Sequence, residues 1–264
     1  MSLIDTHAHL DDSRFDADLD EVVARAAAAG VERVVCVGIS AETSEMAVRL
    51  AEQYDLLVAA AGIQPNSCAE AAPGDWRRVE ELIEHPRVVA LGETGLDRYW
   101  DYTPFEVQED YFDRHLRLSQ QRDLPVLIHC RDCDEDVLRM LREAARRGPV
   151  RGLIHAFSGT SAMAEECLSL GLYLSFAGPV SYRNKKFEPL RLVASRVPAD
   201  RLLVETDSPY LVPHPLRGKL KRNEPSKVAL TAAALAELRG CPVEELSCQT
   251  TTNARRLFRL PAAP

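Results

Sequence analysis

Two histidines spaced two residues apart, His7 and His9, follow a short apolar segment at residues 3–6. In an extended chain, side chains at positions i and i+2 point to the same side, roughly 6.6 Å apart. Neutral imidazole is a common ligand for divalent metals, so two rings on one face could share an ion. The pair could equally be two hydrogen-bonded histidines in a polar turn, so the rest of the chain has to decide between these interpretations.

Ligand-type side chains also stand where later apolar segments end, namely Glu93, His129, His155, Glu205 and Asp207. Four of the seven histidines in the chain occupy such segment ends. Histidines scattered through a core would not be concentrated at the ends of apolar segments. The pattern therefore predicts a metal site assembled from several segment ends.

The number of candidate ligands suits two divalent ions. We expect one ion on His7, His9 and Asp207 and the other on His129 and His155. Glu93 could bridge the two ions, because a carboxylate has two oxygens whereas an imidazole offers one lone pair. Two ions about 3.5–4 Å apart can stabilise both the attacking and the leaving oxygen of a displacement.

Two carboxylates are candidates for a catalytic role. Asp207, beside a metal, could accept the proton of an attacking water. Glu205 lies two residues earlier and on the same face of an extended chain, so it could contribute to the proton transfer. It could equally be a strand-end carboxylate that pairs with an arginine.

The segments that carry these residues alternate strictly with helical patterns. The apolar segments predict eight strands, at residues 3–6, 33–37, 57–62, 88–92, 125–129, 152–155, 172–176 and 202–205. Helical patterns follow at 19–29, 41–53, 76–84, 104–122, 134–147, 161–170, 188–196 and 225–239, with a short extra helix at 243–257. Strands that are apolar throughout are typical of parallel sheets covered on both faces.

Eight strand–helix units predict an α/β fold, a (β/α)₈ TIM barrel with its metal site at the carboxyl ends of the strands. An open doubly wound sheet is the alternative, but no glycine-rich phosphate loop follows the first strand. The length of 264 residues and a hydrophobic content of 46% suit one barrel. We therefore expect a single metal-dependent hydrolase domain over residues 1–264.

Composition excludes several other classes. No apolar run reaches the roughly 18 residues of a membrane helix, and the N-terminus lacks the pattern of a secretory signal. We therefore expect a cytoplasmic protein with no membrane partner. A net charge of −8 argues against a broad nucleic-acid-binding surface, although bound divalent cations could supply positive charge locally to a polyanionic substrate.

Around the candidate ligands the sequence resembles the TatD family of metal-dependent deoxyribonucleases. The matching segments DTHAHLD, GETGLD, IHCRD, HAFSG, ETDSPYL and RNEP begin at residues 5, 92, 128, 155, 205 and 222. The resemblance implies a TIM barrel, divalent metals such as Mg²⁺, and hydrolysis of phosphodiester bonds in DNA. The metal ligands that it implies are the six residues already reached from the segment ends, His7, His9, Glu93, His129, His155 and Asp207.

The sequence departs from the family pattern at two places. The family commonly has G-x-H-P-H after its third strand, where this chain has Gln64 and Asn66 in place of the histidines. Any contact that those histidines make would be absent or pass to the two amides. Ala156 stands where the family usually has a cysteine, a change that we expect to be harmless.

A nuclease also needs contacts to phosphate. A basic segment at 217–222 follows the last strand, and we expect phosphate contacts from Lys221 and Arg222 within it and from Arg98 beside the GETGLD segment. The basic segment could also be a solvated surface turn. Tyr99 and Trp100 could stack on a base or pack against the protein.

These observations predict a divalent-metal-dependent hydrolase that cleaves phosphodiester bonds of DNA, as an exonuclease, with a metal-activated water. Two ions are expected, Mg²⁺ or Mn²⁺, with Zn²⁺ as the alternative that the imidazole content favours. Two other functions stay open: an esterase or deacylase for another substrate such as aminoacyl-tRNA, and a metal-binding scaffold that has lost its activity. DNA is the expected partner, and we expect a monomer.

Overall fold

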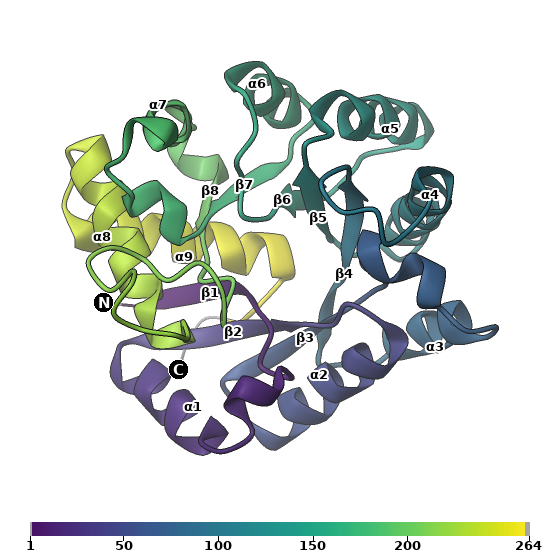
Figure 1. The fold of residues 1–264 in the computed structure, drawn as a ribbon, viewed down its shortest axis with the longest axis horizontal. Helices are drawn as coiled ribbons and strands as arrows, with labels where there is room; N and C mark the ends of the chain where they lie inside the picture. The colour runs from purple at the N-terminus through teal and green to yellow at the C-terminus, as the bar shows by residue number, and fades with distance from the viewer. Residues whose placement is uncertain (1, 262–264) are drawn as a thin grey trace.

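The computed structural model describes residues 2–261, which form a barrel of eight parallel strands surrounded by helices (Figure 1). The strands are β1 (Leu3–Ala8), β2 (Val31–Val37), β3 (Leu57–Ala61), β4 (Val88–Asp97), β5 (Val126–Arg131), β6 (Gly152–Ile154), β7 (Tyr173–Phe176) and β8 (Leu202–Val204). The helices are α1 (Leu19–Ala28), α2 (Ala41–Gln53), α3 (Asp75–Leu82), α4 (Phe105–Arg122), α5 (Asp134–Arg147), α6 (Ser161–Ser169), α7 (Glu188–Arg196), α8 (Val228–Arg239) and α9 (Val243–Phe258). Each strand pairs with the next one along the chain. The predicted (β/α)₈ TIM barrel is confirmed.

The barrel closes where the chain leaving β8 meets β1. Ser208 forms an isolated parallel bridge with Ala8. The N–H of His9 donates to the carbonyl oxygen of Ser208 at 2.7 Å, and the N–H of Asp207 donates to the carbonyl oxygen of His7 at 2.9 Å. These bonds place His7, His9 and Asp207 side by side, although they come from opposite ends of the chain.

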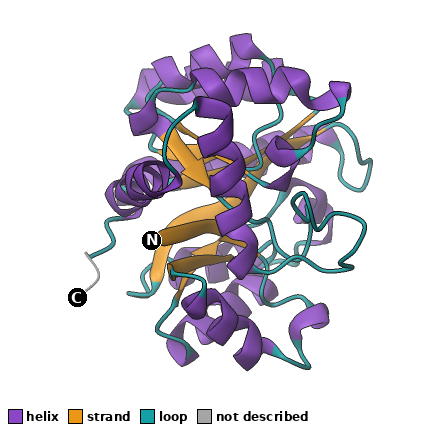
Figure 2. Cartoon of the chain, turned by 90° about the vertical axis from the view of Figure 1, so that its left-hand side faces the viewer, coloured by secondary structure: helices purple, strands orange, loops and turns teal. Residues whose placement is uncertain are grey.

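Apolar side chains cover both faces of the strands. Those that point into the barrel, such as Ile4, Val35 and Leu127, form an inner cluster, and a larger cluster lies between the strands and the surrounding helices. Leu257 and Phe258 of α9 pack against the inner cluster. Figure 2 shows the long loops gathered at the opposite end of the barrel, so that end is left for polar side chains. Within the described residues, no helix is both long and apolar enough to cross a bilayer.

The strands differ from their predicted bounds by one or two residues at an end, except β4, which differs by more. The apolar pattern predicts that β4 ends at Gly92, but the strand continues to Asp97. Gly95 lies opposite His129 of β5 with a φ of +127°, and a Cβ at Gly95 would lie 2.0 Å from the carbonyl oxygen of His129. Because glycine has no Cβ, β4 stays paired with β5 at this close approach. The extension holds Glu93 and Asp97 on a strand beside His129.

Candidate metal centre

The six predicted metal ligands converge at the end of the barrel where the strands end. Within residues 2–261, three groups of three side chains could each hold a metal ion, and they are His7, His9 and Glu93; Glu93, His129 and His155; and His7, His155 and Asp207. The candidate ligand atoms of each group lie within 4.8 Å of one another. Because the groups share members, the six side chains form one continuous cluster.

Glu93 lies at the centre of this cluster. Its Oε2 atom is 3.4 Å from Nε2 of His7 and 3.6 Å from Nε2 of His9. Its Oε1 atom is 2.9 Å from Nδ1 of His129 and 3.1 Å from Nε2 of His155. Each oxygen of one buried carboxylate therefore faces a different pair of histidines, which is the arrangement that a bridging ligand requires.

The nitrogens within each pair lie unusually close together. Nε2 of His7 and Nε2 of His9 are 3.2 Å apart, and so are Nδ1 of His129 and Nε2 of His155. Two imidazole lone pairs at this distance repel each other unless a proton or a cation lies between them. Burial opposes charge on His9, but Asp207 and Glu93 outweigh it and raise the pKa of His9 to about 9. The histidine nitrogens and carboxylates of the cluster therefore favour a positive charge between them, and these ligand types fit divalent cations.

Hydrogen bonds behind the cluster fix which nitrogens face it. Nδ1–H of His9 donates to the carbonyl oxygen of Val37 at 2.9 Å, so Nε2 is the nitrogen that faces the cluster and would give up its proton to bind a cation. Nε2–H of His129 donates to Oδ2 of Asp97 at 2.9 Å, which leaves Nδ1 free. Nδ1 of His155 lies 3.4 Å from Oε1 of Glu205. Such outer partners orient metal-binding imidazoles and make them better ligands.

Comparison with known proteins agrees with this geometry. The family described as TatD related DNase matches residues 4–259. The chain is 44% identical over 258 residues to an uncharacterized metal-dependent hydrolase, YabD of Bacillus subtilis, covering 98% of this chain and 99% of that protein. It is 36% identical to the 3′-5′ ssDNA/RNA exonuclease TatD of Klebsiella pneumoniae, with 97% of both chains covered. The crystal structure of the Escherichia coli TatD homologue YjjV superposes with a TM-score of 0.90 at 32% identity, covering 98% of both chains.

The chain belongs to the TatD family. It is a metal-dependent hydrolase of that family, with a histidine and carboxylate cluster that could bind metal. An organophosphorus hydrolase of Deinococcus radiodurans shares the fold with a TM-score of 0.66, but at 18% identity it shows the fold alone.

The sequence patterns gave no role to Asp97 and marked Asn66 only as a replacement for a family histidine. Asp97 accepts hydrogen bonds from His129 and, at 3.0 Å, from Nδ2 of Asn66. Burial alone would raise the pKa of Asp97, but these hydrogen bonds hold it at about 2. A signal for Asp97 existed, because it lies an even number of residues after Glu93 and so on the same face of a strand. For Asn66 the signal was its position in place of a family histidine.

The two catalytic candidates lie in different surroundings. Glu205 is wholly buried behind His155, where its Oε1 atom accepts the N–H of Ala156 at 2.8 Å. No arginine of the described chain pairs with it. Asp207 lies on the wall of the cleft, with Oδ1 3.5 Å from Nε2 of His9. Burial would raise the pKa of Asp207, but the hydrogen bond from His9 and the neighbouring rings lower it, so the carboxylate is ionised at neutral pH.

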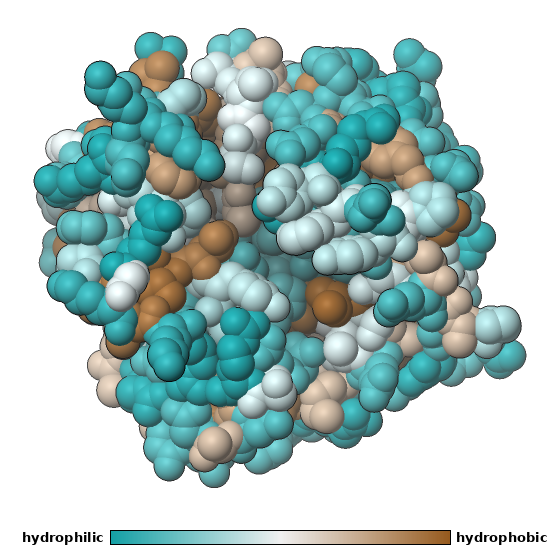
Figure 3. Space-filling view, in the orientation of Figure 1, coloured by the Kyte–Doolittle hydropathy of each residue, from teal (hydrophilic) through white to brown (hydrophobic). Residues whose placement is uncertain are grey.

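Two cavities meet at the cluster and together form a cleft. Their volumes are about 560 Å³ and 590 Å³, and the residues that line both are His129, Arg131, His155, Asp207 and Leu211. The first cavity extends towards Lys186 and Arg217 in the loops after β7 and β8. The second extends towards Trp100 and Tyr210. Figure 3 shows the hollow near the centre of this face.

The three predicted phosphate contacts lie outside the cleft. Nε of Arg98 is 2.7 Å from Oδ2 of Asp136, and the guanidinium of Arg222 binds both carboxylate oxygens of Asp18. Lys221 is exposed, and none of the three lines either cavity. The guanidinium groups of Arg98 and Arg222 are therefore already paired with carboxylates of the protein. The cations that line the cleft are Arg131, Lys186 and Arg217.

Proposed function

We propose that this TatD-family hydrolase is an exonuclease that removes nucleotides from single-stranded DNA with the help of two divalent ions, for which Glu93 would be the shared ligand. The proposal depends on one observation: the two oxygens of the Glu93 carboxylate face two separate histidine pairs, at distances of 2.9–3.6 Å. One ion would be held by the pair from β1 and Asp207, and the other by His129 and His155.

Two cations in these positions would offset negative charge on the phosphoryl and leaving oxygens of a phosphodiester. The ionised Asp207, on the wall of the cleft, accepts the proton of the water that attacks phosphorus. The water oxygen bonds to phosphorus, the bond between phosphorus and the leaving sugar oxygen breaks, and that sugar oxygen takes up a proton from solvent to become a hydroxyl. Arg131, at the junction of the two cavities, contacts a phosphate oxygen. Glu205 acts as a positioning residue, because its only access to the reaction is through His155.

The relatives support nucleic acid as the substrate class. The Klebsiella pneumoniae relative is named a 3′-5′ ssDNA/RNA exonuclease, and the match covers nearly the whole length of both chains. We therefore propose that the strand is digested from its 3′ end. The aromatic side chains that line the cleft, Trp100, Tyr102 and Tyr210, offer surfaces on which the bases of an unpaired strand stack.

The test begins with protein stripped of metal by EDTA and assayed before and after addition of Mg²⁺, Mn²⁺ or Zn²⁺. Single-stranded DNA labelled at either end and an aminoacyl-tRNA ester are given to the same preparation. We expect no DNA hydrolysis in chelator, recovery with added metal, and loss of nucleotides from the 3′ end. Full nuclease activity in chelator, or ester hydrolysis without DNA hydrolysis, would overturn the proposal. Metal binding without any hydrolysis would favour the scaffold alternative.

A further inference from the structure

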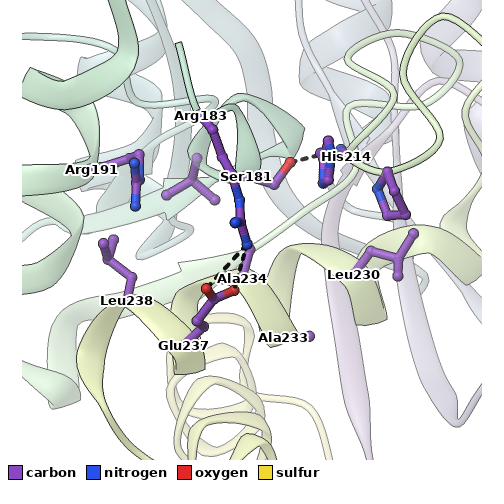
Figure 4. A pocket seen from close by; sticks show the side chains of 11 residues that line it. Ser181, Arg183, Arg191, His214, Leu230, Ala233, Ala234, Glu237 and Leu238 are labelled. Atoms are coloured by element: carbon purple, nitrogen blue, oxygen red, sulfur yellow. Dashed lines mark hydrogen bonds and ion pairs between the residues drawn. The ribbon is translucent and has the colours of Figure 1, made fainter. Parts of the chain in front are cut away.

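A series of connected cavities leads from the cleft to the outer wall of the barrel. The cleft shares Tyr182 and Arg217 with a second cavity of about 400 Å³. That cavity shares Arg183 and His214 with a third, of about 460 Å³, which lies beside α7 and α8 (Figure 4). We call this series the outer track, and its lining residues used below are Tyr182, Arg183, Arg191, His214, Arg217 and Glu237.

The cations along the outer track are largely free of acidic partners. Within residues 2–261, Arg191 and Arg217 of the track make no ion pair, nor does Lys186, which lines the neighbouring cleft. Arginines elsewhere on the helices are mostly paired, including Arg142 of α5 with Glu166. In a chain of net charge −8, such a local excess of free cations marks a surface that attracts a polyanion.

Arg217 is held ready for such a ligand. Its guanidinium lies 4.0 Å from the centroid of the Tyr182 ring. The hydroxyl of Tyr182 donates to the carbonyl oxygen of Val212 at 2.8 Å, which anchors the ring. Stacking on an anchored ring restricts the arginine while leaving its N–H groups available to phosphate.

Arg183 has a partner that phosphate could replace. In the third cavity, its guanidinium lies 3.2 Å from the carboxylate of Glu237 of α8, as the dashed lines in Figure 4 mark. The two side chains are 69% and 73% exposed. An ion pair as exposed as this contributes little stability, so a phosphate group can compete for Arg183 at small cost.

The opposite side of the cleft offers phosphate less positive charge, because Arg131 is the one lysine or arginine among its lining residues and the nearby Arg14 is paired with Asp12. Asp11 and Asp12 line the cavity that holds Trp100 and Tyr210. A terminal nucleotide has no further phosphate on its free side, so it suits this acidic and aromatic region. The rest of the strand, with its phosphates, suits the cationic side.

We infer that the outer track binds the part of a single-stranded DNA substrate that lies beyond the nucleotide being removed. The inference rests on the proposed nuclease function and adds a direction to it. The strand leaves the metal centre past Arg217 and continues past Arg183 and Arg191 to the outer wall. Substrate affinity then rises with strand length until the track is filled, and the rise depends on salt.

Two variants test the track in opposite directions. Arg191→Glu removes a free cation, and Glu237→Gln releases Arg183 from its partner. The matched controls are Arg256→Glu and Glu244→Gln, which change exposed residues of α9 at the far end of the barrel. Steady-state kinetics with metal-loaded enzyme compare a dinucleotide with a single strand of about ten nucleotides, a length that spans several binding positions.

Arg191→Glu should raise KM for the longer strand on the order of tenfold and reduce the slope of its salt dependence by about 0.7 for each phosphate that is no longer neutralised. Glu237→Gln should lower that KM. Neither variant should change kcat or the KM for the dinucleotide. If both track variants behave like their controls while DNA is still hydrolysed, the track is wrong and the nuclease proposal stands. If metal-loaded wild type hydrolyses neither DNA, the nuclease proposal itself fails.

Discussion

His7 in the metal centre and His115 on α4 are both wholly buried, and burial lowers the pKa of both rings. Their partners differ. Nδ1–H of His115 donates to the carbonyl oxygen of Tyr111 at 2.7 Å, and its Nε2 accepts the N–H of Ile63 at 3.1 Å. Nε2 of His7 instead faces other ligand-type atoms, with His9 at 3.2 Å and Glu93 at 3.4 Å.

The comparison separates a structural histidine from a candidate ligand on physical grounds. Burial and the direction of the pKa shift are the same for the two rings, so neither property identifies function. The distinguishing property is whether the nitrogen lone pair is used by a donor of the protein. The Nε2 lone pair of His115 accepts the N–H of Ile63. The Nε2 atom of His7 instead faces the ligand-type atoms of other side chains.

The largest effect is expected at the centre of the metal cluster. Glu93→Ala removes both oxygens that face the histidine pairs, so each proposed ion loses a charged ligand and the bridge between the ions disappears. We expect metal content, measured by plasma mass spectrometry on purified protein, to fall to the level of the chelated wild type. Hydrolytic activity should fall with it.

His115→Gln is the matched control, since it changes an equally buried polar side chain on another element. It should retain metal. An unchanged metal content in Glu93→Ala would contradict the bridging role. Loss of metal in both variants would contradict the assignment of His115 as a structural histidine and of His7 as a metal ligand on the basis of their contacts.

A second prediction concerns stability at low pH. Burial lowers the pKa of His115 from its ordinary value of 6.5 to about 4. A depressed pKa means that the unfolded chain binds a proton before the folded one does. The neutral ring therefore contributes stability above pH 6.5 that is lost as the pH falls towards 4, and the loss amounts to about 3 kcal/mol.

Chemical denaturation between pH 7 and 4, in the presence of chelator, measures this loss. In His115→Gln the corresponding part of the pH dependence should disappear, while the part due to other groups should remain. Identical pH slopes for the two proteins would show that His115 does not stay neutral in the folded state.

The fold and the proposed ligands could be predicted because both depend on local patterns. Apolar segments define strands, and the carboxyl ends of parallel strands meet at one end of a barrel, so His129 and His155 were predicted to be neighbours without knowledge of any contact. The bounds of β4 were not predictable in this way. Its extension depends on Gly95 passing close to the backbone of another strand, which no pattern within 88–97 reveals.

The partners of charged side chains were also beyond the sequence. Arg98 and Arg222 lie beside motif residues in the chain, but their carboxylate partners, Asp136 and Asp18, come from other elements. Sequence distance gives no information on such pairs, because they form only once helices and loops are packed. The hydrogen bond between Asp97 and His129 likewise joins two elements, β4 and β5, although the spacing from Glu93 already places Asp97 on the same face of the strand.

The third prediction tests that carboxylate. Asp97→Asn keeps the size of the side chain but weakens the acceptor for Nε2–H of His129, so the ring is less firmly oriented. Removal of such an outer partner lowers metal affinity by about 10- to 100-fold. Calorimetric titration of the metal-free protein measures the change. Asp136→Asn, which alters a carboxylate outside the centre, should leave metal affinity unchanged, and equal affinities in the two variants would contradict the role of Asp97.

The smallest effect is expected at Asn66, which touches the centre only through Asp97. Its Nδ2 donates to the same Oδ2 atom that accepts the proton of His129. Asn66→Ala removes one hydrogen bond, worth about 1 kcal/mol, and should weaken metal binding roughly fivefold. Ser67→Ala, in the same turn, serves as the control.

A double-mutant cycle decides whether Asn66 acts in this way. If Asn66 influences the metal only by orienting Asp97, its substitution should have almost no further effect in an Asp97→Asn background, because the acceptor it orients is already gone. Additive losses in the double variant would mean that Asn66 contacts the bound ions or their water by a separate route. In that case the Asn66 amide would have taken over a direct contact from the histidine that stands at this position in the family. Asn66 would then belong with the residues that contact the ions, and not with those that orient the ligands.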